Sequence, residues 1–186
     1  MPAGAASRRV GDLDGDGKAD TEWISDTPTL RFGVTTASGA TFSYALPSAS
    51  PAPREGFVTR LNDHRVVSIV DDNRAAYLHF LVNCAWVTPK DSHGVQYTFD
   101  LQDLTGHGTG VGCSKGYVVG FQATKGTNGY TVKQTQILLN TTGSVASNGP
   151  TTTVVTKAPA SDPRVKTAMT ISCATVTIAN GGVHVG

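Results

Sequence analysis

Four aspartates near the N-terminus are the residues of this sequence whose type and spacing best suit chemistry. They occupy the first, third, fifth and ninth places of the stretch 12–20. Alternate spacing in a tight turn lets several carboxylates face one centre, and calcium takes about 6–8 oxygen ligands at roughly 2.3–2.6 Å. The sequence therefore predicts a calcium (Ca2+) site with carboxylate ligands from Asp12, Asp14, Asp16 and Asp20.

Other residues of this loop fit the same interpretation. Gly15 and Gly17 can adopt positive φ angles at little cost, which a tight loop requires. Lys18 stands at the seventh place, where a calcium loop uses a backbone carbonyl as ligand. Without a cation, four carboxylates this close would repel one another. The alternative is a metal-free surface turn, because Asp and Gly are common turn residues.

The residues after the loop exclude a helix–loop–helix calcium site. Such a site needs a bidentate acid at the twelfth place, which is Trp23 here. Pro28 follows soon after, so a long exiting helix cannot form. The stretch 21–24 is instead expected to be a short strand.

A loop followed by a strand resembles the calcium loops of FG-GAP and VCBS repeats. The segment 10–20, VGDLDGDGKAD, closely matches that family's loop, and Phe32-Gly33 matches its Phe-Gly, although no Gly-Ala-Pro follows. The resemblance implies a propeller blade in a secreted protein, with loops on one face that bind proteins or glycans. It is strong over about a dozen residues and weak over the rest of the chain.

Bulk composition excludes several classes of partner. The chain has 186 residues, 39% of them hydrophobic and 16% charged, and a net charge of +1. That balance gives no electrostatic reason to expect nucleic acid. No apolar run approaches the roughly 18 residues that a membrane span needs. The first residues lack the hydrophobic region of a signal peptide.

The three cysteines leave one unpaired if a disulfide forms. We expect a bridge between Cys84 and Cys113, because that pair closes the shortest loop; three buried free thiols are the alternative. Calcium loops of this type suit the millimolar calcium outside cells, where disulfides also persist. Both features favour a secreted or cell-envelope location.

Short strand-like runs bounded by Gly, Pro, Ser and Asn predict an all-β chain. A hairpin turn is expected at 125–129, with its Asn-Gly signal, and at most one short helical turn near 162–165. The expected strands are 21–24, 29–34, 40–46, 56–61, 65–70, 75–82, 84–88, 96–101, 118–123, 130–139, 151–157 and 170–178.

A weak internal repeat suggests the architecture. Asp103 and residues 104–108 align with Asp12 and residues 13–17, but three carboxylates are missing, so the loop 103–111 is expected to hold no metal. Residues 57–63 are a third, shorter trace of the repeat, and repeat starts about 40–50 residues apart match a four-stranded propeller blade. We expect a small or incomplete β-propeller, with a β-sandwich as the alternative. Residues 1–9 are expected to be disordered, before one β domain of four blade-like units at about 10–56, 57–96, 97–150 and 151–186.

No catalytic motif stands out. The five histidines are isolated, and His79 lies in an apolar run where a structural role is the simpler interpretation. Asp71 and Asp72 are interpreted as a solvated turn, since adjacent side chains point apart. The larger aromatic residues could form a sugar-stacking platform, but burial within strands is the favoured interpretation. We therefore expect no enzyme.

Three functions fit these features. The favoured one is a secreted or cell-surface, calcium-stabilised binding or scaffold module that presents loops to a protein or glycan. One alternative is a structural subunit of a surface assembly, in which exposed strand edges pair between chains. The other is a cell-wall or polysaccharide hydrolase, which needs two carboxylates facing a cleft.

Overall fold

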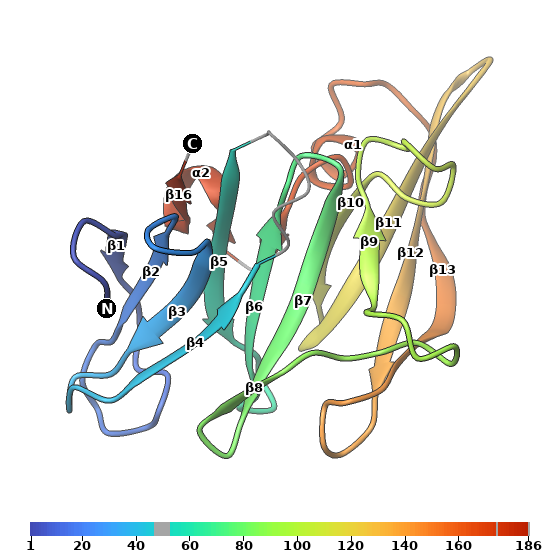
Figure 1. Cartoon of the computed structure of the whole chain (residues 1–186). Helices are drawn as coiled ribbons and strands as arrows, with labels where there is room; N and C mark the ends of the chain where they lie inside the picture. Colours follow the sequence, from blue (N-terminus) through green and yellow to red (C-terminus); the bar gives the residue numbers. More distant parts are fainter. Residues whose placement is uncertain (47–52, 174, 186) are drawn as a thin grey trace.

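A computed structural model describes residues 1–46, 53–173 and 175–185 of the chain. The described residues form three larger antiparallel sheets, which lie side by side from the blue N-terminal sheet to the yellow and orange third sheet (Figure 1), and one two-stranded sheet near the C-terminus. The expected all-β class is confirmed.

The first sheet contains the strands on either side of the acidic loop. It consists of β1 (Ala6–Arg9), β2 (Thr21–Ser25), β3 (Arg31–Thr35) and β4 (Thr41–Ala45), in that order. Gly33 of β3 is required by close packing, because a Cβ there would lie 2.5 Å from the Trp23 ring. The Phe-Gly pair thus has a physical reason in this chain: Phe32 fills the core while Gly33 makes room for Trp23.

The middle sheet is covered on both faces. Its order is β16 (Val183–Val185), β5 (Arg54–Arg60), β6 (Val66–Asp71), β7 (Ala75–Val82) and β8 (Ala85–Val87), and β9 (Thr98–Asp100) also pairs with β7. Successive strand residues point to opposite faces. On β6, Val66 and Val70 pack toward the first sheet, whereas Val67 and Ile69 pack toward the third. Every residue of β6 is buried, the polar Ser68 and Asp71 included, so its apolar residues face both neighbouring sheets.

The third sheet is built from longer strands. It consists of β10 (Gly110–Ser114), β11 (Tyr117–Gly126), β12 (Gly129–Leu139) and β13 (Ala146–Ala158). The hairpin between β11 and β12 turns at the expected place, with Gly126 paired to Gly129. One face packs on the middle sheet, and the other packs Val132 and Phe121 against α1 (Pro163–Thr167).

The C-terminal part returns to the middle sheet. The expected helical turn is confirmed as α1, whose N-cap is Asp162. It is followed by β14 (Ser172–Cys173), β15 (Val176–Thr177), α2 (Ile178–Gly181) and β16. β16 pairs with β5, with Val183 opposite Gly56. Among the described residues, no helix has the length and apolar character that crossing a membrane requires.

The observed sheets differ in their bounds from the expected units. Residues 1–9, expected to be disordered, include β1, in which Arg8 pairs with Glu22. The sheet expected over 97–150 runs from β10 to the end of β13. The stretch 151–186 contributes the end of β13, the two helices and three short strands, and forms no four-stranded sheet within the described residues.

The disulfide joins Cys113 to Cys173, so the expected Cys84–Cys113 pair is wrong. Cys84 is free and exposed. The pairing follows from the C-terminal segment lying along β10, where the Val111 N–H donates to the Thr170 carbonyl at 3.1 Å. This contact brings the Cα atoms of the two bridged cysteines to 4.5 Å. Sequence separation alone could not reveal it.

Candidate metal centre

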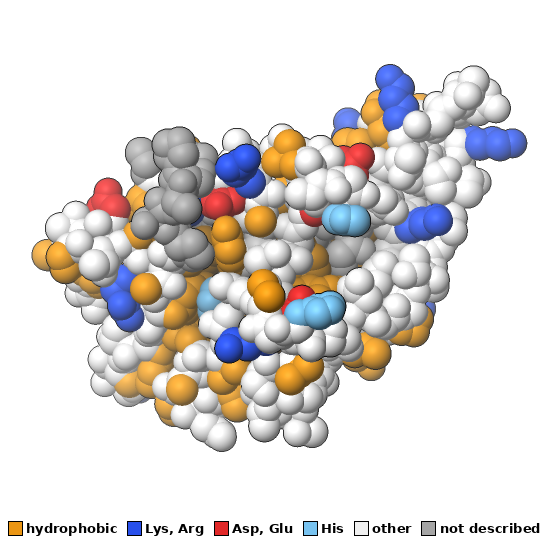
Figure 2. Space-filling view, turned by 45° about the vertical axis from the view of Figure 1, so that its right-hand side comes forward, with side chains coloured by type: hydrophobic (Ala, Val, Ile, Leu, Met, Phe, Trp, Pro, Cys, Tyr) orange, Lys and Arg blue, Asp and Glu red, His pale blue; other side chains and the backbone are white. Residues whose placement is uncertain are grey.

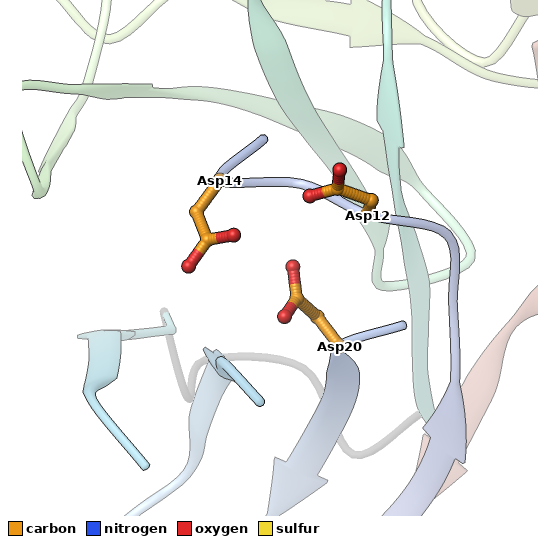
Figure 3. Close-up of side chains that lie close together, drawn as sticks. All are labelled: Asp12, Asp14 and Asp20. Carbon is orange, nitrogen blue, oxygen red and sulfur yellow. The ribbon is translucent and has the colours of Figure 1, made fainter. Parts of the chain in front are cut away.

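The acidic loop connects β1 to β2 and brings three of its four aspartates together. Asp12, Asp14 and Asp20 each offer a carboxylate oxygen, and these oxygens all lie within 4.8 Å of one another. Figure 3 shows the three side chains pointing toward a common space. The spacing in the sequence therefore places these carboxylates as expected.

Asp12 is fixed by the turn that follows it. Its Oδ2 accepts the N–H of Gly17 at 2.9 Å, and its Oδ1 accepts the N–H of Gly15 at 2.6 Å. Both glycines have positive φ angles, of 81° at Gly17 and 89° at Gly15. These two donors, together with the nearby Arg60, hold the pKa of Asp12 below its usual range despite some burial. Its carboxylate is thus ready to bind a cation at neutral pH.

Asp14 and Asp16 each close a short turn. Asp14 Oδ1 accepts the N–H of Asp16 at 3.2 Å, and Asp16 Oδ1 accepts the N–H of Lys18 at 2.8 Å. Asp16 is exposed and stands outside the group of three converging carboxylates. Its role as a ligand, and that of the Lys18 carbonyl, stay predictions.

Asp20 anchors the loop to the body of the protein. Its side chain is only 1% exposed. Oδ2 accepts the N–H of Leu13 at 2.7 Å, and Oδ1 accepts the N–H of Ala37, in the turn between β3 and β4, at 3.0 Å. A buried carboxylate needs such donors or a cation. No sequence pattern pointed to Ala37, because only the packing of the first sheet brings its turn beside the loop.

The arrangement suits a hard cation. Carboxylate oxygens are the ligands that calcium and magnesium prefer. The loop hydrogen bonds are made by backbone N–H groups, so each carboxylate oxygen keeps a lone pair for a metal. Gly17 also stands at the sixth place of the loop, where calcium loops need glycine for a sharp turn. The residues present therefore fit a divalent cation.

The related loop at 103–111 is organised differently. Asp100, rather than Asp103, receives its backbone donors: Oδ2 accepts the N–H groups of Thr105 at 3.0 Å, His107 at 3.1 Å and Gly108 at 3.2 Å. One carboxylate thus closes this loop through hydrogen bonds. Within the described residues, the acidic loop at 12–20 is the one place where three acidic or metal-binding side chains converge.

The middle sheet holds a pair of carboxylates that the sequence did not predict to lie together. Glu55 and Asp71 are directly opposite on β5 and β6 and line one pocket of about 450 Å³. Burial, with smaller effects from Glu55 and Asp72, raises the pKa of Asp71 to about 6. The solvated turn expected at Asp71 and Asp72 is wrong, since both are buried.

The structural interpretation of His79 agrees with its surroundings. The residue is 3% exposed, and its ring stacks on Tyr44 with 3.7 Å between ring centres. Burial lowers the pKa of His79 to about 3, so the ring is neutral at physiological pH.

The chain matches no protein-family model, no curated protein and no solved structure. The resemblance to FG-GAP and VCBS loops therefore rests on the loop residues themselves.

Proposed function

We propose that this protein is a secreted or cell-surface binding or scaffold module of the FG-GAP/VCBS type, stabilised by calcium and without catalytic activity. The observation that carries the proposal is the convergence of Asp12, Asp14 and Asp20 within 4.8 Å. Bound calcium would offset the repulsion among these carboxylates and join β1, β2 and the turn at Ala37 through a single centre.

The sheet arrangement supports the propeller-like part of the proposal. Propeller blades are four-stranded antiparallel sheets packed face to face. The first and third sheets each have four strands in sequence order, and each packs on the middle sheet. We propose an open arc of such blades. In the β-sandwich alternative, two sheets built from distant parts of the sequence would instead face each other.

Two further features support the proposed setting. The Cys113–Cys173 bridge is compatible with a secreted protein, because disulfides persist in oxidising compartments. On the face shown in Figure 2, the Lys and Arg side chains are scattered, with no large basic patch. Together with the net charge of +1, this supports a protein or glycan as the proposed ligand.

Thermal unfolding with calcium and with a chelator tests the proposal. Calcium that binds only the folded state stabilises it by about 2.7 kcal/mol at a hundredfold excess over Kd. We expect a higher Tm in calcium, loss of this response in Asp14→Asn, and an unchanged response in the control Asp26→Asn. Magnesium should substitute poorly, because it needs near-octahedral geometry. A wild-type melting curve that is the same with calcium and with chelator would contradict the proposal.

The Glu55–Asp71 pair favours a second candidate, a polysaccharide hydrolase. Directly opposed strand residues have Cβ atoms about 4.5–5.5 Å apart. From such positions the two carboxyl groups can reach the separation of about 5–9.5 Å that glycosidases use. Asp71, protonated below about pH 6, would serve as the acid and Glu55 as the nucleophile or base. Hydrolysis of a labelled cell-wall polymer that is lost in both Asp71→Asn and Glu55→Gln would favour this candidate. No turnover by the wild type at pH 5 would exclude it.

A further inference from the structure

A cleft of about 310 Å³ opens where β9 faces the third sheet. Its size is at the lower end of the range of small-ligand pockets. One wall comes from Tyr97, Phe99 and Asp100, at or next to β9, and the other from β11, β12 and β13. The acidic loop contributes no residue to it.

The wall of the cleft that the third sheet forms is an outward continuation of the sheet face that packs on the middle sheet. Residues that alternate along a strand share a face. Along β11, Val118 is buried between the middle and third sheets, Gly120 comes next on that face, and Gln122 lines the cleft. Along β12, the same face changes from buried Ile137 to Thr135 and then Lys133. Polar residues thus begin on this face where the two sheets separate.

The register holds these polar side chains beside one another. Gln122 is opposite Lys133, and Thr135 is opposite Thr151. The hydroxyls of Thr135 and Thr151 are hydrogen-bonded at 2.8 Å. Gly120 forms the narrow end, because a Cβ there would lie 3.3 Å from the Phe99 ring. The wall is therefore a set of polar groups on paired strands, which positions them more rigidly than a loop would.

The opposite wall presents aromatic rings and a carboxylate. The Tyr97 hydroxyl donates to the Asn148 side chain, and its ring meets Phe99 edge to face at 5.5 Å. Burial alone would raise the pKa of Asp100, but the side-chain and backbone groups of Thr105 and the N–H groups of His107 and Gly108 lower it overall. Asp100 Oδ1 is buried and accepts no hydrogen bond from any described residue.

The chemistry of both walls identifies a ligand class. The two fully charged lining residues, Asp100 and Lys133, have opposite signs, which disfavours a strongly charged ligand. Amides and hydroxyls make up much of the rest, which disfavours a purely apolar one. A sugar unit offers hydroxyls that both donate and accept, together with C–H surface that packs on an aromatic ring. We propose that this cleft binds a neutral saccharide unit of a glycan.

The inference rests on the proposed function as a binding module and names the ligand class that the module would take. Binding is tested by calorimetry with neutral tetrasaccharides of glucose, xylose, mannose and N-acetylglucosamine, and with tetragalacturonate as the acidic comparison. At least one neutral probe should bind. Binding of none of them, or tighter binding of tetragalacturonate, would overturn the proposal.

Substitutions then locate the site. Lys133→Ala combined with Asn148→Ala removes two exposed polar groups and should weaken binding by about tenfold or more. Thr151→Ala should weaken it less. The matched control is Thr152→Ala, since Thr152 is the next residue of β13, is exposed and points to the opposite face. Equal affinity in the double variant and the wild type would overturn the assignment.

The experiments distinguish a failure of the proposed calcium site from a failure of the proposed saccharide cleft. If cleft substitutions abolish saccharide binding but chelation leaves the Tm unchanged, the calcium site is wrong and the cleft assignment stands. If chelation lowers the Tm but no neutral probe binds, the cleft assignment is wrong and the calcium site stands.

Discussion

Asp20 accepts a hydrogen bond from the N–H of Ala37 at 3.0 Å, which ties the end of the acidic loop to the turn between β3 and β4. Asp20 therefore has a structural role that does not need a cation. The exposed Asp14, in contrast, makes its one hydrogen bond with a described residue inside the loop, to the N–H of Asp16. The two residues should respond differently to substitution.

We predict that Asp20→Ala destabilises the protein even in chelator. The substitution leaves the N–H groups of Leu13 and Ala37 without an acceptor, at about 1–3 kcal/mol for each group that stays buried. Asp14→Ala should lower stability only in calcium. Urea denaturation of both variants, with calcium and with chelator, measures the difference. Equal losses for the two variants in chelator would contradict this assignment.

We predict that Asp103→Asn leaves calcium binding unchanged. Asp100 already receives the backbone donors of that loop, and Asp103 belongs to no group of three converging metal-binding side chains among the described residues. Calcium stoichiometry by calorimetry should be the same for the wild type and the variant. A lower stoichiometry in the variant would reveal a second calcium site.

We predict that Cys113→Ser and Cys173→Ser each destabilise the protein by about 4 kcal/mol, the chain-entropy value for a bridge across 60 residues. Cys84→Ser should have little effect, since Cys84 is exposed and free. Mass spectrometry of unreduced peptides checks the pairing, and urea denaturation checks the energies. A peptide linking Cys84 to Cys113 would refute the bridge described above.

We predict that stability falls as the pH rises from about 6.5 to about 8, and that Glu22→Gln removes this fall. Burial raises the pKa of Glu22 to about 8, while the Val58 N–H and the charge of Arg8 oppose the rise only in part. The folded state therefore keeps a proton that the unfolded state has lost. Each pH unit in this window costs up to about 1.4 kcal/mol.

Other groups with shifted pKa values change the stability of the folded state mainly below about pH 6.5. Asp71, with its pKa raised to about 6, reduces stability as the pH rises toward 6, and His79, with its pKa lowered to about 3, reduces stability as the pH falls below about 6.5. Urea midpoints from pH 5 to 9 for the wild type and Glu22→Gln separate these effects. Parallel curves for the two proteins above pH 6.5 would contradict the role of Glu22.

Local patterns predicted much of the fold and part of the candidate metal centre. Alternating residues placed strands such as β4 and β7 close to their observed bounds, because strand formation depends on local side-chain periodicity. Spacing also brought Asp12 and Asp14 into one group, since both belong to a single turn.

Contacts between distant segments were not predictable in the same way. The pairing of Cys113 with Cys173 depends on the C-terminal segment lying along β10. The opposition of Glu55 and Asp71 depends on the register of β5 and β6. The saccharide cleft needs both the face of the third sheet and the position of β9, and local sequence patterns specify neither.

The pairing of Val183 with Gly56 has a consequence for how the protein folds. The middle sheet, which supports both neighbouring sheets, gains its edge strand only when residues 183–185 are available. Pairing across so long a stretch of chain is slow, because closing a long loop has a large entropic cost. We therefore expect the native state to form slowly and after synthesis of this segment, with β5 exposed as an unpaired edge until β16 docks.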